Sequence, residues 1–331
     1  MSRFVGVDVG GTKSAAVLID ETGATIASTW TEHRGQWQGR ILETVASSID
    51  NLLAQAGVGL AAVGAIGVAV AGLVSSDRSV LVHSPIIAET HLDLGARLSE
   101  RTGRPVTVEN DANATLYCIG GRNRPAGDRT SDDSRVSLLL TLGTGVGGAI
   151  MVGDRILVGE HGFATELGHI TVDYSDERTC VCGNRGCVEQ FASGRGLEEL
   201  AELTPPPASV ATLASHGATA TLSARDIVAA AERGDPWATG LLATAGAMLG
   251  RAISVLCVIL DPTTVTISGS FGHATKRWLL PAAAQEMRVR WTYPAERPLP
   301  RLAMDPIGPY AAAVGAAMLA AGQCDKDWAD A

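Results

Sequence analysis

The sequence contains no cluster of lysine or arginine residues, and its 26 basic side chains are outnumbered by 35 acidic ones. The formal net charge of −9 therefore offers no positive surface to a nucleic-acid backbone. Aromatic residues make up only 4% of the chain, but hydrophobic residues together make up 46%, too much for a disordered polymer. At 331 residues the chain is long enough for two domains with cores of their own.

Long uninterrupted apolar segments are also lacking. The uncharged run 58–76 is broken by glycines where a buried strand is expected, and the apolar run 241–260 contains Arg251. Neither predicts a membrane-spanning helix. The chain enters a strand at residue 4, which leaves no room for a secretory signal. We therefore expect a soluble protein located in the cytoplasm.

Cysteine is scarce but unevenly placed. Three of the six cysteines, Cys180, Cys182 and Cys187, fall within eight residues in the pattern C-x-C-G-x-x-G-C. His169 lies just upstream, and glycines between the cysteines allow the chain to reverse direction. Three thiolates and one imidazole suit a closed, structural Zn²⁺ site. One alternative is that the three cysteines simply lie in a turn and bind nothing. Another is a disulfide, which is disfavoured because nothing else indicates a secreted protein.

Two parts of the chain repeat the same order of elements. In each, a strand leads into a glycine turn and then into further strands that form a hairpin. The predicted strands are 4–9, 15–19 and 25–30 in the first part, and 136–142, 149–152 and 156–158 in the second. The main predicted helices are 41–55, 94–101, 196–203, 224–233, 236–260 and 309–321. Asp93 and Ser223 are predicted caps, Asp235-Pro236 a predicted helix start, and Gly103 a predicted helix end. This pattern predicts two similar α/β lobes.

The two glycine turns lack the sequences of familiar nucleotide loops. Gly143-x-Gly145-x-x-Gly148 matches a dinucleotide fingerprint in letters, but a strand follows it where that motif requires a helix. The first turn, Asp8–Lys13, lacks the Walker A spacing. Glycine turns can nevertheless expose backbone N–H groups to phosphate oxygens, or simply be tight hairpins. Two matched turns favour a nucleotide held by both.

Several motifs together resemble the ROK family of sugar kinases and repressors. These are DVGGTK, VENDANA, LGTGVGGAI, ELGH and CVCGNRGCVE, in the family's order and spacing from residue 4 to about 322. The resemblance, closest to the zinc-containing bacterial glucokinase-like members, implies an actin-like (ribonuclease H-like) ATPase fold of two α/β lobes. The implied small lobe comprises residues 1–110 and 308–322. The implied large lobe comprises residues 111–307 and contains the zinc knuckle, by which we mean the segment 160–190 with His169 and the three clustered cysteines.

The resemblance also implies roles for individual residues. The nucleotide would be bound by Asp8, Gly10, Gly11, Thr12, Lys13, Gly143, Thr144, Gly145 and Gly269. The sugar would be bound by Gly72, Asn110, Asp111, Glu166, His169 and Glu189. The zinc ligands would be His169, Cys180, Cys182 and Cys187, with Asp111 as catalytic base. The implied cofactors are ATP, Mg²⁺ and structural Zn²⁺, with Asp8 the nearest protein group to Mg²⁺, through water.

Elementary chemistry agrees with these roles. Phosphoryl transfer to a sugar hydroxyl needs a group that accepts the hydroxyl proton, and Asp111 at a strand end can do so. The alternative for Asp111 is a cap on the following helix. Carboxylate and amide groups can bind sugar hydroxyls in directed pairs. A zinc-bound histidine keeps one ring nitrogen for a further partner.

Some positions depart from the family pattern. The segment His83-Ser84-Pro85 replaces its usual proline–asparagine pair, and Ser268-Gly269-Ser270 replaces consecutive glycines. His83 or Glu89 would then face a sugar substituent or lie on the surface.

We expect an ATP-dependent hexose kinase acting on the 6-hydroxyl of glucose. The alternatives are a kinase of kanosamine, N-acetylglucosamine or N-acetylmannosamine and, more distantly, a sugar-responsive repressor or an inactive sugar sensor. The family suggests a homodimer.

Overall fold

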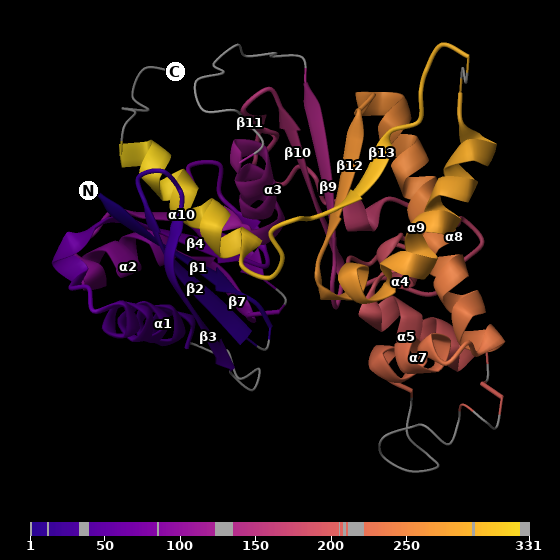
Figure 1. Cartoon of the computed structure of the whole chain (residues 1–331), viewed down its shortest axis with the longest axis horizontal. Helices are drawn as coiled ribbons and strands as arrows, with labels where there is room; N and C mark the ends of the chain where they lie inside the picture. The colour runs from indigo at the N-terminus through magenta and orange to yellow at the C-terminus, as the bar shows by residue number, and fades with distance from the viewer. Residues whose placement is uncertain are drawn as a thin grey trace. The chain divides into compact units, whose positions relative to one another are not determined.

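The computed structural model describes residues 2–11, 13–32, 40–84, 86–122, 135–204, 206–207, 210, 222–292 and 295–324. The chain forms two compact units, coloured along the sequence in Figure 1. Unit 1 comprises Met1–Asp133, Ile150–Thr165 and Pro306–Ala331, and unit 2 comprises Ser134–Ala149 and Glu166–Asp305. These units and the two expected lobes do not divide the chain at the same residues, and the lobe boundaries stay a prediction.

Unit 1 is built on a five-stranded sheet in the order β3-β2-β1-β4-β8. Its strands are β1 (Arg3–Val9), β2 (Lys13–Asp20), β3 (Thr25–Glu32), β4 (Val63–Val70) and β8 (Val106–Asn110). The first three form an antiparallel meander, whereas β1, β4 and β8 run parallel. Since β4 is covered on both faces, it is a nearly continuous apolar run, as its sequence predicted.

Helices cover both faces of this sheet. On one face α1 (Ile41–Ala56) and α2 (Leu94–Thr102) enclose a core of aliphatic side chains, and on the other α10 (Ala311–Cys324) packs beside α3 (Asp111–Arg122). The small residues of α10 allow its backbone to approach the sheet closely. A Cβ atom added at Gly6 would lie 1.8 Å from the Ala313 carbonyl oxygen, so only glycine fits there.

A second, three-stranded sheet of unit 1 connects β4 to α2. Its order is β5-β6-β7, from β5 (Leu73–Val74), β6 (Leu81–Ser84) and β7 (Glu89–Leu92). The short helix η1 (Leu60–Ala62) precedes β4. The sequence analysis did not anticipate this sheet, because its strands are only two to four residues long.

The sheet that contains the strands of unit 2 has the order β11-β10-β9-β12-β13, the same arrangement as the five-stranded sheet of unit 1, although β11 and residues 150–152 of β10 fall within unit 1. Its strands are β9 (Val136–Leu142), β10 (Val146–Val152), β11 (Arg155–Ile156), β12 (Thr264–Ser268) and β13 (Arg301–Met304). As with β1, β4 and β8, the strands β9, β12 and β13 run parallel. The repeat predicted from the order of elements is therefore present in the strand topology.

Two long helices support the sheet of unit 2. Helix α8 (Pro236–Leu260) begins with an Asp235 side-chain cap, as predicted, and lies along α9 (Ser270–Arg290) in Figure 1. Although α8 is long and apolar enough to cross a membrane, 56% of its most apolar window is buried inside the protein. Glycines at 246 and 250 bring the two backbones together. The remaining helices among the described residues are η2 (Leu167–His169), α4 (Glu189–Ala192), α5 (Gly194–Leu203) and α7 (Ala224–Glu232).

Candidate functional site

In unit 1, polar residues gather where the parallel strands end. The registers pair Asp8 of β1 with Ala69 of β4, and Val70 of β4 with Asn110 of β8. Asp8 and the Asn110–Asp111 pair therefore lie at the same edge of the sheet, the edge where α/β folds place their ligands. Asp111 begins α3 directly after β8. The structure thus brings together the two carboxylates that the sequence motifs singled out separately.

The Asp8 and Asp111 carboxylates are close enough to affect one another. Asp8 is half-buried, and loss of hydration, followed by repulsion from Asp111, raises the pKa of Asp8 to about 7. Lys13 acts in the opposite direction and lowers the pKa of Asp8. Two carboxyl groups with such coupling suit a cation or a proton between them. This acidic pair is the main chemical feature of unit 1.

Asn110 both caps α3 and holds a neighbouring loop. Its Oδ1 accepts hydrogen bonds from the backbone N–H groups of Ala112 (2.9 Å) and Asn113 (3.2 Å). Its Nδ2 donates to the Gly72 carbonyl at 3.1 Å. A Cβ atom at Gly72 would lie 2.5 Å from the His83 carbonyl oxygen, so this close approach needs glycine. The helix cap considered for Asp111 is therefore supplied mainly by Asn110, although Asp111 Oδ1 also accepts from Ala112 N–H.

An ion pair beneath Asn110 was not identified from the sequence. The Glu109 side chain, only 4% exposed, lies with Oε2 2.9 Å from Arg78 Nε, without the alignment of a good hydrogen bond. Glu109 Oε1 accepts from the Asn110 N–H (2.9 Å) and from Asn113 Nδ2 (3.0 Å). Arg78 has a left-handed backbone (φ 59°). The strain and the buried charge together fix the backbone on which Asn110 and Asp111 sit.

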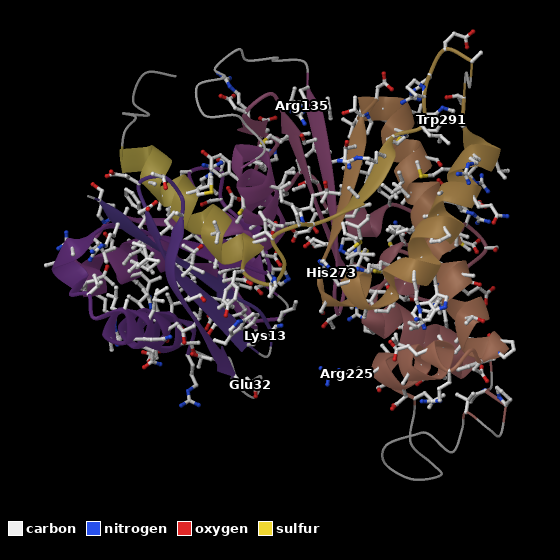
Figure 2. All side chains as sticks on the ribbon, in the orientation of Figure 1. Lys13, Glu32, Arg135, Arg225, His273 and Trp291 are labelled. Atoms are coloured by element: carbon white, nitrogen blue, oxygen red, sulfur yellow. The ribbon has the colours of Figure 1, made fainter. Side chains whose placement is uncertain are left out.

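The first glycine turn joins β1 to β2. The Gly10 N–H donates to the Lys13 carbonyl at 3.0 Å, which closes the turn, and Gly11 lies at its bend. Thr12, predicted to bind nucleotide, lies outside the described residues. Lys13, labelled in Figure 2, is exposed at the start of β2, with Nζ 4.5 Å from the centre of the Trp30 ring. This cation–π contact fixes the position of the Lys13 ammonium group, the one positive charge in the Asp8–Lys13 sequence.

The second glycine turn joins β9 to β10 in unit 2. Here the Gly143 N–H donates to the Gly145 carbonyl at 2.9 Å, and Thr144 is exposed at the tip. Gly269 lies against the same turn, because a Cβ atom there would be 2.2 Å from the Leu142 carbonyl oxygen. Gly269 also has a left-handed φ of 86°. The structure therefore brings together four residues predicted to bind nucleotide, from the ends of β9 and β12.

The three knuckle cysteines and His169 converge in unit 2. Their ligand atoms all lie within 4.8 Å of one another. Cys180 Sγ is 3.5 Å from His169 Nδ1, and Cys182 Sγ is 3.7 Å from Cys187 Sγ. One imidazole nitrogen and three sulfurs at these separations fit the donor set of a tetrahedral zinc site. The fit supports Nδ1, not Nε2, as the histidine ligand.

The knuckle backbone is held by turns rather than by strands. The Cys180 N–H donates to the Asn184 carbonyl and the Gly183 N–H to the Cys180 carbonyl, both at 2.8 Å. Gly183 and Gly186 are left-handed, as their proposed role in chain reversal requires. Burial raises the pKa of the Cys187 thiol well above its usual range. A divalent cation bound by these cysteines would reverse this shift by stabilising the thiolates.

The other side of the His169 ring faces Glu166. His169 Nε2 lies 3.9 Å from Glu166 Oε2, and Glu166 remains about half exposed at 48%. Loss of hydration raises the pKa of Glu166, and the His169 charge partly offsets it. Thr165, just before Glu166, has a left-handed backbone (φ 71°), a strained conformation for a β-branched residue. With Nδ1 facing the cysteines, Nε2 and Glu166 can bind the same ligand.

Glu189 is buried and already has several partners. Its Oε2 accepts from the Val146 N–H at 2.9 Å, and its Oε1 accepts from Arg195 Nη2 at 2.9 Å. Cys180 Sγ lies 3.8 Å from the same Oε1. The sequence analysis placed Glu189 near the knuckle but did not identify Arg195. Glu189 therefore contacts both the knuckle and the strand after the second glycine turn.

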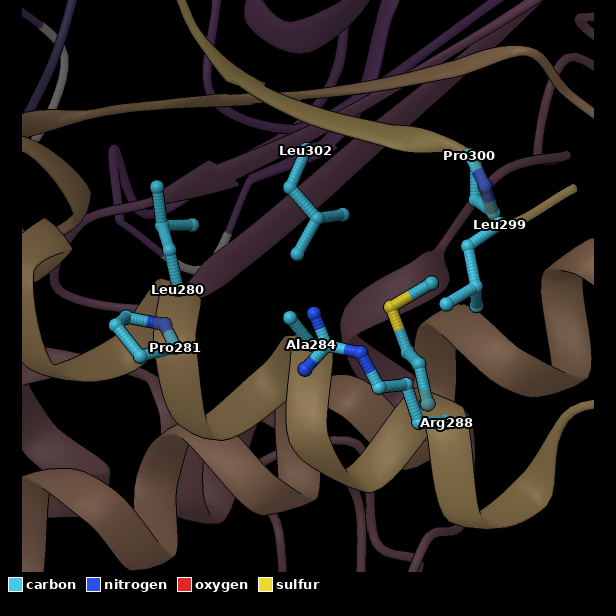
Figure 3. Close-up of a pocket in the computed structure, with 8 residues that line it drawn as sticks. Leu280, Pro281, Ala284, Arg288, Leu299, Pro300 and Leu302 are labelled. Carbon is cyan, nitrogen blue, oxygen red and sulfur yellow. The ribbon is translucent and has the colours of Figure 1, made fainter.

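A shallow cavity of about 360 Å³ lies elsewhere in unit 2, between α9 and the segment before β13 (Figure 3). Leucine, proline, alanine and methionine side chains line it, with Arg288 the one charged residue. None of its lining residues was predicted to belong to the site. We assign it no function.

Comparison with known proteins shows similarity along nearly the whole chain. A model of the ROK family matches residues 4–323. The glucokinase of Streptomyces coelicolor is 33% identical over 325 residues, which cover 97% of this chain and 98% of that protein. An N-acetyl-D-glucosamine kinase of Salmonella arizonae is 27% identical over 82% of this chain and 85% of its own. A ROK family glucokinase from Streptomyces griseus, crystallised with glucose and AMPPNP, has a TM-score of 0.80 at 29% identity, covering 96% and 99% of the two chains.

Proposed function

This chain belongs to the ROK family, and from that premise we propose that it is an ATP-dependent kinase that phosphorylates the 6-hydroxyl of glucose or of a close analogue. The near full-length similarity to glucokinases supports a hexose kinase. The observation that carries the proposal is the pair of carboxylates, Asp8 and Asp111, at one edge of the unit 1 sheet and beside a glycine turn.

In this proposal Asp111 is the general base. A sugar hydroxyl attacks phosphorus more readily when its proton passes to a nearby carboxylate. The fixed position of Asp111 at the first turn of α3, behind the Asn110 cap, supports this role. Asp8 is the protein group best placed to assist Mg²⁺, since a carboxyl group with a pKa raised to about 7 gains most from a nearby cation. Magnesium would neutralise charge on the nucleotide phosphates.

The two glycine turns would hold the phosphates of ATP. In unit 1, Gly10 and Gly11 form the turn and Lys13 would supply a cation, and Thr12 belongs to the same prediction. In unit 2, Gly143, Thr144, Gly145 and Gly269 form the corresponding glycine-rich turn. Turns of this kind bind anions through several N–H dipoles at once. The assignment of ATP as donor follows the family.

The sugar-binding residues would be Gly72, Asn110, Asp111, Glu166, His169 and Glu189. The Asn110 side chain already serves α3 and Gly72, so we propose that it mainly positions the loop. His169 Nε2 and Glu166 present a donor and acceptors that suit a pair of adjacent hydroxyl groups. Zinc, held by His169, Cys180, Cys182 and Cys187, would be structural: it would fix the direction of the His169 ring.

The second candidate is an amino-sugar or N-acetylamino-sugar kinase. The similarity to an N-acetyl-D-glucosamine kinase favours it, at lower identity than the glucokinases. A sugar-responsive repressor or an inactive sensor is more distant, because the residues of both phosphate turns and Asp111 are retained. We further propose a cytoplasmic enzyme that forms a homodimer and binds no nucleic acid.

The test is a coupled assay of ADP release with purified protein, ATP and Mg²⁺. Glucose, mannose, glucosamine, kanosamine, N-acetylglucosamine and N-acetylmannosamine are compared by kcat/KM. We expect glucose to have the highest value. A higher value for an amino sugar would select the second candidate, and no turnover with any sugar would refute the kinase proposal and favour a sensor.

A further inference from the structure

Arg195 lies at the meeting point of the second glycine turn and the cysteine knuckle. It is the second residue of α5, whose N-terminus contacts the turn. The Gly194 N–H donates to the Gly143 carbonyl at 2.9 Å, and the Arg195 N–H donates to the Thr144 carbonyl at 3.4 Å. The backbone at Gly194 and Arg195 is therefore attached to the turn through two consecutive hydrogen bonds.

The Arg195 side chain is attached to Glu189. Its Nη2 donates to Glu189 Oε1 at 2.9 Å, and its Nε lies 3.8 Å from Glu199, one helical turn further along α5. Among the described residues, Arg195 is the one cation paired with Glu189. Glu189 is 7% exposed, so its charge is costly without this partner. The Arg195 side chain is 40% exposed and can be replaced without removing a core side chain.

Glu189 occupies a space that the glycine turn leaves for it. A Cβ atom at Gly145 would lie only 2.4 Å from Glu189 Oε2, the oxygen that accepts the Val146 N–H. The knuckle lies on the other side, since Cys180 Sγ is 3.8 Å from Oε1. The η2 segment that carries His169 packs on the same strand, because a Cβ at Gly168 would lie 2.0 Å from the Val146 carbonyl oxygen. The carboxylate thus fills the interface between turn and knuckle.

We propose that Arg195 is a positioning residue that holds the Glu189 carboxylate against the Val146 N–H and thereby couples the metal knuckle to the second glycine turn. A metal-bound cysteine is a thiolate, so Cys180 would then present negative charge to Glu189, and Arg195 supplies the compensating charge. Loss of Arg195 should therefore disturb both metal retention and substrate binding. The inference rests on the proposed kinase function for its kinetic part only.

The experiment compares Arg195→Met with Arg195→Lys and with Arg233→Met. Arg233 is an exposed arginine at the end of α7, so its substitution removes the same charge without contacting Glu189. Two quantities are measured on folded, zinc-loaded protein: the rate of zinc release to a chromogenic chelator, and kcat and KM for glucose and ATP separately. Circular dichroism verifies that each variant is folded.

We expect Arg195→Met to release zinc roughly 10–100-fold faster, as loss of a partner behind a metal ligand does elsewhere. We expect KM for glucose or ATP to rise about five- to thirtyfold with a smaller fall in kcat, because a charged hydrogen bond is lost from a group that positions substrate. Arg195→Lys should recover part of both effects, since one ammonium can still pair with Oε1. Gly145→Ala, which displaces the same carboxylate from the opposite side, should reproduce the change in KM.

The proposal is overturned if either quantity, zinc release or KM, stays within about twofold of the Arg233→Met control in an active enzyme. A change in zinc release alone would show that Arg195 only stabilises the knuckle. If the wild-type protein phosphorylates no sugar, the proposed function fails instead. The two failures are distinguishable, because the first requires a wild-type enzyme that turns over.

Discussion

The two units fix their candidate functional side chains by different means. In unit 1, Asp8, Asn110 and Asp111 lie at the ends of regular parallel strands, whose backbone hydrogen bonds define where each side chain begins. In unit 2, the knuckle has only two isolated β-bridges, Thr171↔Cys187 and Thr179↔Arg185, and a single 3₁₀ turn. A ladder of hydrogen bonds positions the first set, whereas turns, a compact His/Cys cluster and an ion pair position the second.

The two arrangements also differ in the electrostatics of the groups that they bring together. Unit 1 brings two carboxylates together, and repulsion between them contributes to the raised pKa of Asp8. The regular sheet and the buried Arg78–Glu109 pair resist that repulsion. Unit 2 instead brings together thiols, and burial raises the pKa of Cys180 and Cys187. Its geometry should therefore depend on metal, whereas that of unit 1 should not.

The largest expected effect separates chemistry from binding in unit 1. Asp111→Asn keeps the size of the side chain and its bond to the Ala112 N–H but removes the proton acceptor. We expect kcat to fall by roughly 10²–10⁴-fold with little change in sugar affinity. ADP release and calorimetric sugar binding measure the two quantities. Asp154→Asn, at an exposed turn, is the control, and near wild-type activity in Asp111→Asn would rule out the base assignment.

Metal removal should affect unit 2 far more than unit 1. Chelation, or the variant Cys180→Ser, should abolish amide-exchange protection across residues 166–190 while β1, β4 and β8 stay protected. Elemental analysis should find about one zinc per chain in the wild-type protein. Cys257→Ala, which removes a buried cysteine of α8 outside the knuckle, should retain the metal. A metal-free protein with unchanged exchange would contradict a zinc site.

The third prediction concerns the ion pair that supports unit 1. Arg78→Met leaves the buried Glu109 carboxylate without its cation, which should lower the free energy of unfolding by roughly 3–5 kcal/mol. Because Glu109 also accepts the Asn110 N–H, kcat should fall as well. Urea denaturation measures the first effect. Arg97→Met, an exposed change on α2, should alter stability by less than about 0.5 kcal/mol. Equal stabilities of the two variants would show that the pair contributes nothing.

The smallest effect is a pH dependence that originates at Asp8. Its pKa rises from 3.8 to about 7 on folding, so its contribution to stability is complete below about pH 4 and is lost as the pH rises through about 7. Asp8→Asn removes this loss. We compare the free energy of unfolding of the variant with that of the wild type by urea denaturation at two pH values. The difference should favour the variant more at about pH 8 than at about pH 5. An identical difference at both pH values would argue against a raised pKa.

Local signals in the sequence predicted much of the fold. Asp93 and Ser223 cap helices α2 and α7 through their side chains, and the glycine at 103 ends α2 in a left-handed conformation, all as predicted. Such caps depend on residues two to four positions apart, which a sequence displays directly. The family, the two-lobed α/β class and the hexose kinase activity were likewise inferred correctly. The individual site assignments remain predictions.

Helix α9 was not predicted. It contains Pro281 in its interior, which normally ends a helix, and its apolar residues follow no clear stripe. It forms because α8 accepts it closely: a Cβ atom at Gly246 would lie 2.6 Å from the Leu279 carbonyl oxygen. Packing against another helix outweighs the local cost of the proline. Only the folded unit supplies that partner.

The knuckle was the clearest feature of the sequence, because its cysteines and glycines lie within eight residues and define one another's positions. Its ligand set could thus be predicted without coordinates. The sequence alone could not show that Glu189 faces Arg195 and the Val146 N–H, 43 residues away, or that Arg78 pairs with Glu109 across 31 residues. Long side chains have many partners available along a chain, and tertiary packing alone selects one.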